Sequence, residues 1–232
     1  MAARDVGDAV RDVADRIEQA IAQQVEFDPH WFRRAFHAFG AAFVAYYLLP
    51  SEGTVGLFRD VLPLAIFAGA VGLELYRMSG RVPTEAFFGL REYERRRVSG
   101  YVYFGFSVLL LVYLFPQPIA VACILAAAIG DPIVGEFRRA NLPAASVVAG
   151  SAFVLGVFLL IDFHPLLAVF GTALMIVAER VKIRWLDDDF LMPMLPAAAL
   201  YAITASGLFA ALGIGLPPDP ITTTVEVPSW LA

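Results

Sequence analysis

The sequence contains a single cysteine, a single lysine and few charged residues. The lone cysteine, Cys123, excludes an intramolecular disulfide framework and any metal site built from several cysteines. The net charge of -5 argues against nucleic-acid binding, and no compact basic nucleic-acid motif is present. Charged residues make up only 17% of the chain and hydrophobic residues 59%, against about 45 to 50% apolar in soluble domains. The composition therefore predicts a membrane protein.

Long apolar runs fill most of the chain. A helix needs about 20 residues to cross the hydrocarbon of a bilayer, so the shorter runs must recruit flanking residues. The runs are 37–49, 57–76, 101–115, 119–129, 144–161, 165–181 and 190–214. They predict an all-α, polytopic integral membrane protein with about seven transmembrane helices.

The basic residues predict the orientation of these helices. All but one of the 17 Lys+Arg fall on the same side of a seven-helix arrangement, and only Arg59 falls on the other side. Cytoplasmic loops carry the excess of Lys and Arg. We therefore expect a cytoplasmic N-terminus and an outside C-terminus in the cell membrane.

The N-terminal segment has apolar residues at three- and four-residue spacing, among them Val6, Val10, Val13 and Ile17. This spacing predicts an amphipathic cytoplasmic helix over 1–30. Its polar face is mainly acidic, which favours packing against cytoplasmic loops or a second subunit of a homodimer over an anionic membrane surface. A transmembrane catalytic domain at 31–216 and an extracytoplasmic tail at 217–232 complete the predicted organisation.

Asp131 stands in the segment AIGDPIVGEF, where the apolar run 119–129 becomes long enough to cross a membrane only if it continues to 137. The aspartate would then lie at membrane depth, where ionisable groups indicate function. Because Pro132 biases the preceding residue away from helical geometry, we expect a helix break at Gly130 and Asp131. Asp131 then either caps the following helix or forms a metal or phosphate site at the break.

Three consecutive acids, Asp187, Asp188 and Asp189, precede the last apolar run. One interpretation is a helix cap, with Asp187 as the capping residue and favourable negative charge at the helix start. The other is a Mg²⁺ site, because three adjacent carboxylates exceed what a cap requires and a hard cation would relieve their repulsion. Glu179 ends the preceding run and is expected near this site.

Arginines gather on the same predicted face. The segment 91–100, REYERRRVSG, is either a solvated loop or a clamp for phosphate, whose oxygens match the donors of Arg. Arg33, Arg34 and His37 share one helix face, and they either contact phosphate or anchor the first helix at the lipid headgroups.

Four stretches, in order, resemble the polytopic CTP-dependent lipid kinases, a family that includes dolichol kinase, phytol kinase and yeast-type diacylglycerol kinase. They are RRAFH at 33–37, REYERRRVSGYVYFG at 91–105, IGDPIVGE at 129–136 and AERVKIRWLDDDFLMP at 178–193. The resemblance implies CTP-dependent phosphorylation of a long-chain isoprenoid alcohol, dolichol- or polyprenol-like, at the cytoplasmic membrane face.

The resemblance also implies roles for individual residues. Asp131 and Asp188 would be catalytic, and together with Asp189 they would hold Mg²⁺. Glu179 is a further expected Mg²⁺ ligand because its position in the sequence, and not the resemblance, brings it near these acids. The residues expected to bind the nucleotide and its phosphates are His37, Glu92, Arg95, Arg96, Gly100, Gly130, Arg138, Arg139, Gly150 and Ser151.

One departure from the family bears on this prediction. Family members carry a Lys-Ser or Lys-Thr pair after the Gly-Asp motif, whereas Ser146 stands near that place here and Lys182 lies elsewhere. Either Arg138 or Arg139 replaces the lysine, or the donor differs, or catalysis is lost. The alternative function is a small transporter or a non-catalytic lipid-binding membrane protein.

Overall fold

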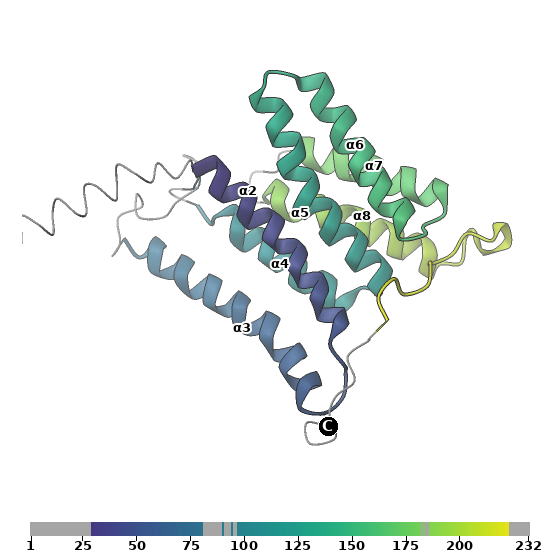
Figure 1. Ribbon diagram of the computed structural model, residues 1–232, viewed down its shortest axis with the longest axis horizontal. Coiled ribbons are helices and arrows are strands. Elements are labelled where there is room, and N and C mark those ends of the chain that lie inside the picture. The colour runs from purple at the N-terminus through teal and green to yellow at the C-terminus, as the bar shows by residue number, and fades with distance from the viewer. Residues whose placement is uncertain are drawn as a thin grey trace, which may run out of the picture.

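The computed structural model describes residues 29–80, 90, 94, 97–181, 183 and 186–222 (Figure 1). Apart from one isolated β-bridge between Ile183 and Leu186, the regular structure of these residues is helical, so the predicted all-α class is confirmed. The helices are α2 (Pro29–Phe39), η1 (Gly40–Leu48), α3 (Gly53–Met78), α4 (Gly100–Leu114), α5 (Gln117–Arg139), α6 (Pro143–Leu160), α7 (Pro165–Arg180), α8 (Asp188–Ala205) and η4 (Ala210–Leu212). The amphipathic helix predicted over 1–30 and most of the 217–232 tail lie outside the described residues.

Three described helices, α3, α5 and α6, are long and apolar enough to cross a membrane. This is the composition of a membrane protein. Each of the seven predicted apolar runs falls on a helix, with α2 and η1 together carrying the first. The apolar helix α4 is shorter than a usual span.

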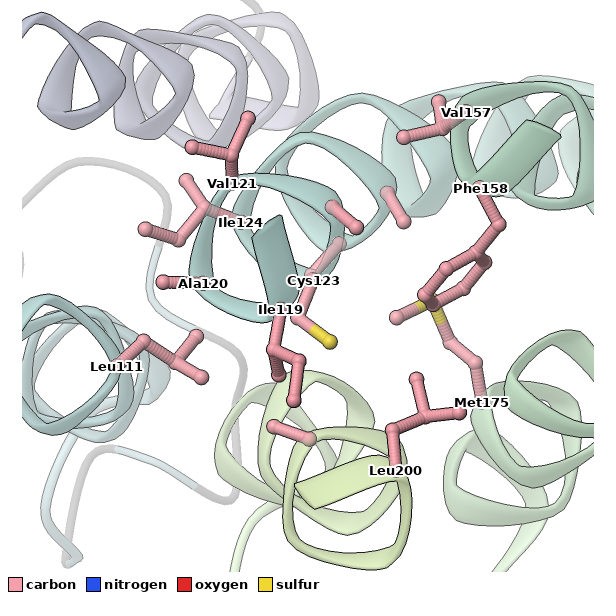
Figure 2. Packing of buried hydrophobic residues seen from close by; sticks show 14 of the residues in the cluster. Leu111, Ile119, Ala120, Val121, Cys123, Ile124, Val157, Phe158, Met175 and Leu200 are labelled. Carbon is pink, nitrogen blue, oxygen red and sulfur yellow. The ribbon is translucent and has the colours of Figure 1, made fainter. Parts of the chain in front are cut away.

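Helix α5 forms the centre of the bundle and packs against α2, η1, α4, α6 and α8. Its small side chains allow this close approach, as is typical of helices that pack in membranes. Ala120, Ala122 and Cys123 are fully buried between the neighbouring helices, and Figure 2 shows Ala120 and Cys123 with residues of α4, α6, α7 and α8 around them.

The expected helix break at Gly130 and Asp131 is wrong, because α5 continues through both residues and through Pro132 to Arg139. Asp131 therefore caps no helix. A proline inside a helix removes its N–H bond to the carbonyl four residues earlier, and its ring crowds that carbonyl, which together cost about 3 kcal/mol. Packing of α5 on both sides of this point outweighs the local bias of the residue before proline. At about 34 Å, the unbroken helix is long enough to cross the hydrocarbon.

Helix α3 lies at one edge of the bundle, outside the other helices (Figure 1), and its main contact is with α4. Most of its side chains are exposed although they are apolar, including Leu57, Phe58, Leu62 and Ile66. Such a surface is stable in hydrocarbon but not in water. The exposure of α3 therefore fits a helix that faces lipid.

The element between α2 and α3 is a nine-residue 3-10 helix, η1, which is unusually long for this conformation. It begins at the buried Gly40. A Cβ atom at Gly40 would lie 2.2 Å from Cε1 of Phe104 on α4. The glycine thus lets the start of η1 approach α4 more closely than any other residue could.

Candidate functional site

Three helices bring His37, Asp131 and Asp189 together. The imidazole of His37 on α2 lies between the two carboxylates, with Nδ1 3.9 Å from Asp131 Oδ2 on α5 and Nε2 3.6 Å from Asp189 Oδ1 on α8. One ligand atom from each residue lies within 4.8 Å of the other two. His37 is only 2% exposed and Asp189 3%. We call His37, Asp131, Asp188 and Asp189 the acidic site.

The start of α8 separates the three consecutive aspartates by role. Asp187 is the N-cap, and its Oδ1 accepts a hydrogen bond of 3.1 Å from the backbone N–H of Asp189, which confirms the predicted cap. Asp188 lines a cavity, whereas Asp189 points into the bundle toward His37. Burial, a hydrogen bond with Asp188 and the charge of Asp189 raise the pKa of Asp187 to about 8.

Arg33 joins the acidic site to the segment before α4. Its Nη2 donates to Asp189 Oδ2 at 2.7 Å, and its Nη1 lies 3.3 Å from Oε1 of the fully buried Glu94. The same Glu94 oxygen accepts a 3.0 Å hydrogen bond from the backbone N–H of Gly100. A Cβ at Gly100 would lie 2.0 Å from Asp189 Oδ2, so only glycine fits there.

A second buried ion pair holds the segment before α4 from the other side. Glu74 and Arg77, one turn apart on α3, are joined at 2.6 Å, as their spacing predicts. Glu74 Oε1 also accepts from the backbone N–H of Ser99 at 2.7 Å, and Arg77 donates to the backbone carbonyl of Arg97 at 2.6 Å. The pair therefore fixes the start of α4, and with it Gly100.

A cavity of about 460 Å³ opens beside the acidic site, and we call it the rim cavity. Its charged and polar lining includes Arg97, Tyr103, Arg138, Glu179, Asp187 and Asp188. Arg138 Nη2 and Glu179 Oε1 form an ion pair at 2.5 Å across α5 and α7. Glu179 thus lies near Asp187 and Asp188, as the sequence predicts, but its partner is an arginine.

The structure places other predicted site residues outside this cluster. Gly150 is a packing residue, because a Cβ there would meet Val134 Cγ2 at 2.4 Å, and Ser151 donates to the carbonyl of Val147 within its own helix. Gly130 is buried within α5 against α6, whereas Arg139 ends α5. Glu92, Arg95 and Arg96 lie outside the described residues.

One site residue, Glu94, was missing from the predicted set, and Arg33 has partners other than those expected, because it pairs with Glu94 and Asp189. The helix face that Arg33 shares with His37 placed it near the site, as the sequence predicts, but did not identify its acidic partners. Glu94 stands among arginines in a segment expected to be polar, and nothing in that pattern distinguishes a fully buried acid from a solvated one.

The donor set of the acidic site suits a divalent cation. Besides His37, Asp131 and Asp189, the ligand atoms of Asp187, Asp188 and Asp189 also lie within 4.8 Å of one another. Carboxylate oxygens are the ligands that Mg²⁺ and Mn²⁺ prefer, and an imidazole is compatible with transition metals. Arginines lie beside these acids, so phosphate and cation could be held next to one another.

Comparison of the chain with protein-family models, with curated proteins and with solved structures finds no match.

Proposed function

We propose that the chain is a lipid-alcohol kinase that transfers the γ-phosphoryl group of CTP to the hydroxyl of a long-chain isoprenoid alcohol. The observation that carries this proposal is the meeting of His37, Asp131 and Asp189 from three helices, beside a cavity lined by arginines and acids. The cluster lies in a bundle whose helices include three apolar enough to span a membrane. A water-soluble nucleotide and a membrane-dissolved alcohol can both reach such a place.

The acids of the site account for the metal and proton requirements of this reaction. Asp131, Asp188 and Asp189 would hold Mg²⁺, whose chemistry is to neutralise charge on the phosphate oxygens. We propose that Asp131, which is partly buried whereas Asp189 is buried, accepts the proton of the substrate hydroxyl. His37, whose ring lies between Asp131 and Asp189, would offer a further ligand atom to the cation.

The arginines of the rim cavity account for phosphate binding. Arg97 and Arg138 line the same cavity as Asp187 and Asp188. Arg138 is paired with Glu179, and its side chain is about half exposed, so it can exchange this carboxylate for a phosphate oxygen. We propose that Arg138 does the work of the lysine that related kinases carry. Ser146 does not, because it is buried and donates to Pro143 within its own helix.

The location we propose for the site is the cytoplasmic face of the cell membrane. Most of the arginines lie at one end of the bundle. In the predicted topology this end is formed by the last residues of α3, α5 and α7 and the first residues of α2, α4, α6 and α8. The positive-inside rule assigns such an end to the cytoplasm, the compartment that contains CTP.

The direct test is phosphate transfer by the purified protein in lipid nanodiscs. With Mg²⁺, CTP and a polyprenol, we expect a polyprenyl phosphate to form, and we expect Asp131→Asn, Asp188→Asn and Asp189→Asn to abolish it. Asp162→Asn is the matched control, since Asp162 is exposed in the turn after α6, far along the chain from the site, and Asn tolerates its positive φ of 66°. No product with CTP, ATP or GTP and any isoprenoid alcohol would refute the kinase proposal.

A further inference from the structure

The guanidinium of Arg33 on α2 is held by contacts with three separate segments. Its Nη2 donates to Asp189 Oδ2 on α8 at 2.7 Å, and its Nη1 donates to Glu94 Oε1, before α4, at 3.3 Å. Its central carbon lies 5.7 Å from the ring centre of Tyr101 on α4, within the range of a cation–π contact. Arg33 is only 9% exposed, so these contacts are made away from water. They fix the position of its charged group.

The two carboxylate oxygens of Asp189 face different groups. Oδ2 accepts from Arg33 and lies against Gly100, where a Cβ atom would come within 2.0 Å of it. Oδ1 lies 3.6 Å from Nε2 of His37. Rotation of the carboxylate would break the hydrogen bond from Arg33, and the burial of Asp189 leaves little room for water to replace it. Arg33 therefore holds Oδ1 toward His37.

Glu94 anchors the other branch of the guanidinium. Its side chain is fully buried, and its Oε1 accepts from the backbone N–H of Gly100 at 3.0 Å as well as from Arg33. Because this oxygen is bonded to the backbone at the start of α4, it gives Arg33 a fixed point. The contact with two carboxylates at once uses the planar fork of donors that a guanidinium has and an ammonium lacks.

The charge of Arg33 is by itself unfavourable beside a cation site. A guanidinium bonded to a ligand carboxylate repels a divalent cation that binds the same carboxylate. If Arg33 acted through its charge alone, its removal would tighten cation binding. Removal of a partner that orients a metal ligand has the opposite effect and typically weakens metal affinity by about 10- to 100-fold. The two roles thus predict changes of opposite sign.

We propose that Arg33 is a positioning residue for the cation of the acidic site. It acts through Asp189, by directing Oδ1 toward the side of the carboxylate where His37 and Asp131 offer their own ligand atoms. This inference rests on the part of the proposed function that places a divalent cation at the acidic site. It does not depend on the nucleotide, on the lipid alcohol or on phosphate transfer.

The test is the affinity for Mn²⁺ of the metal-free, full-length protein in phosphatidylcholine nanodiscs, measured from the signal of free Mn²⁺ in electron paramagnetic resonance. Mn²⁺ is a suitable probe because it prefers the same oxygen ligands as Mg²⁺. Binding at the acidic site is the part that Asp131→Asn removes. We expect Arg33→Gln to weaken this binding by about 10- to 100-fold.

Arg34→Gln is the matched control. Arg34 is the next residue on α2 and is also ion-paired, but its partner is Glu136 of α5 and not a carboxylate of the acidic site. The control removes the same charge from the same helix, so it should bind Mn²⁺ at least as tightly as the wild type. Arg33→Lys is a second variant that decides the question if Arg33→Gln does not fold. It keeps the charge but lacks the fork, and it should also weaken Mn²⁺ binding.

Thermal unfolding of the metal-free variants separates positioning from stability. A purely structural role of Arg33 would lower the unfolding temperature and leave the Mn²⁺ affinity of the folded protein unchanged. Unchanged or tighter Mn²⁺ binding in folded Arg33→Gln, or unchanged binding in Arg33→Lys where only that variant folds, would overturn the inference and leave the proposed function standing.

Two further outcomes concern the proposed function. Weakened Mn²⁺ binding in Arg33→Gln, in a protein that transfers no phosphate, would refute the kinase proposal and leave the role of Arg33 standing. A wild-type protein with no Mn²⁺ binding that Asp131→Asn removes would overturn both the cation site and the role of Arg33.

Discussion

At the scale of single residues, Gly100 is the position with the least freedom around the acidic site. Its α-carbon faces Asp189, Arg33 and Glu94 at once, and all three side chains are held by ion pairs. A methyl group at this position would displace Asp189 from His37. The glycine therefore connects the packing of α4 to the geometry of the carboxylates.

We expect Gly100→Ala to lower the free energy of unfolding by about 1 to 3 kcal/mol, the usual range for overpacking a tight site. Thermal unfolding in detergent measures this change. Gly69→Ala is the control, because nothing lies within 4 Å of the added Cβ and alanine favours a helix interior by up to about 1 kcal/mol. Equal stability of the two variants would show that the site around Gly100 is looser than described.

Asp187 predicts a pH dependence of stability. Its pKa rises from 3.8 toward about 8 on folding, so the folded protein retains a proton that the unfolded chain has lost. Stability therefore falls as pH rises from about 4 to 8 and changes no further above that range through this group. Asp187→Asn keeps a capping side chain and should flatten the fall, measured as unfolding midpoints at pH 5 and pH 8 without divalent cations. An unchanged pH slope in the variant would contradict the assignment.

Residue patterns identified the members of the acidic site but did not predict which aspartate faces His37 and which lines the rim cavity. Asp131, His37 and the aspartate row stand out in the sequence because ionisable groups are rare in apolar segments. Which aspartate faces His37 depends on the helical phase at the start of α8, and that phase follows from Asp187 taking the capping position. The cap was predicted, but the side of α8 that packs toward α2 was not, so spacing alone could not separate Asp188 from Asp189.

At the scale of elements, the ion pair at the end of α3 fixes the start of α4. Arg77 is 4% exposed and Glu74 8%, so water reaches neither charge, and each is stabilised by the other. The pair also binds the backbone of Ser99 and Arg97. Helix α3 has its main contact with α4, which makes this polar connection important for its position.

Glu74→Gln is expected to lower the free energy of unfolding by about 3 to 5 kcal/mol, because it leaves the buried charge of Arg77 without its counter-ion. Combining it with Arg77→Met removes that charge and should recover part of the loss. A thermal-unfolding double-mutant cycle measures both effects. If Glu74→Gln alone is as stable as the wild type, the pair does not hold the start of α4.

The positions of the helices were largely predictable, and their internal geometry was not. Apolar runs marked each helix because burial in lipid requires hydrophobic side chains. The continuity of α5 through Pro132 was missed because tertiary packing overrode a local preference. The 3-10 conformation of η1 was also missed, since GAAFVAYYL carries no signal that distinguishes it from an α-helix.

At the scale of the whole molecule, the proposal requires the acidic site and the rim cavity to face the cytoplasm. Ser51 lies before α3 and Ala140 follows α5, at opposite ends of the bundle in the predicted topology. Both are exposed. The single native cysteine, Cys123, is fully buried and should not react.

These positions give a direct test of orientation in intact cells. A membrane-impermeant maleimide should label Ser51→Cys from outside and label Ala140→Cys only after the membrane is permeabilised. The wild type, with Cys123 alone, is the control and should remain unlabelled. The reverse pattern would place the acidic site outside the cell, where it could not bind cytoplasmic CTP, and would contradict the proposal.

The most direct test of the central claim is to compare two labels of the same nucleotide in the transfer reaction. The acidic site is proposed to move the terminal phosphoryl group, so polyprenol incubated with the protein and Mg²⁺ should acquire label from γ-labelled CTP and none from α-labelled CTP. Loss of this transfer in Asp131→Asn, with Asp162→Asn unaffected, would tie it to the site. Label from the α position would show nucleotidyl transfer instead, and absence of label from both would contradict the account.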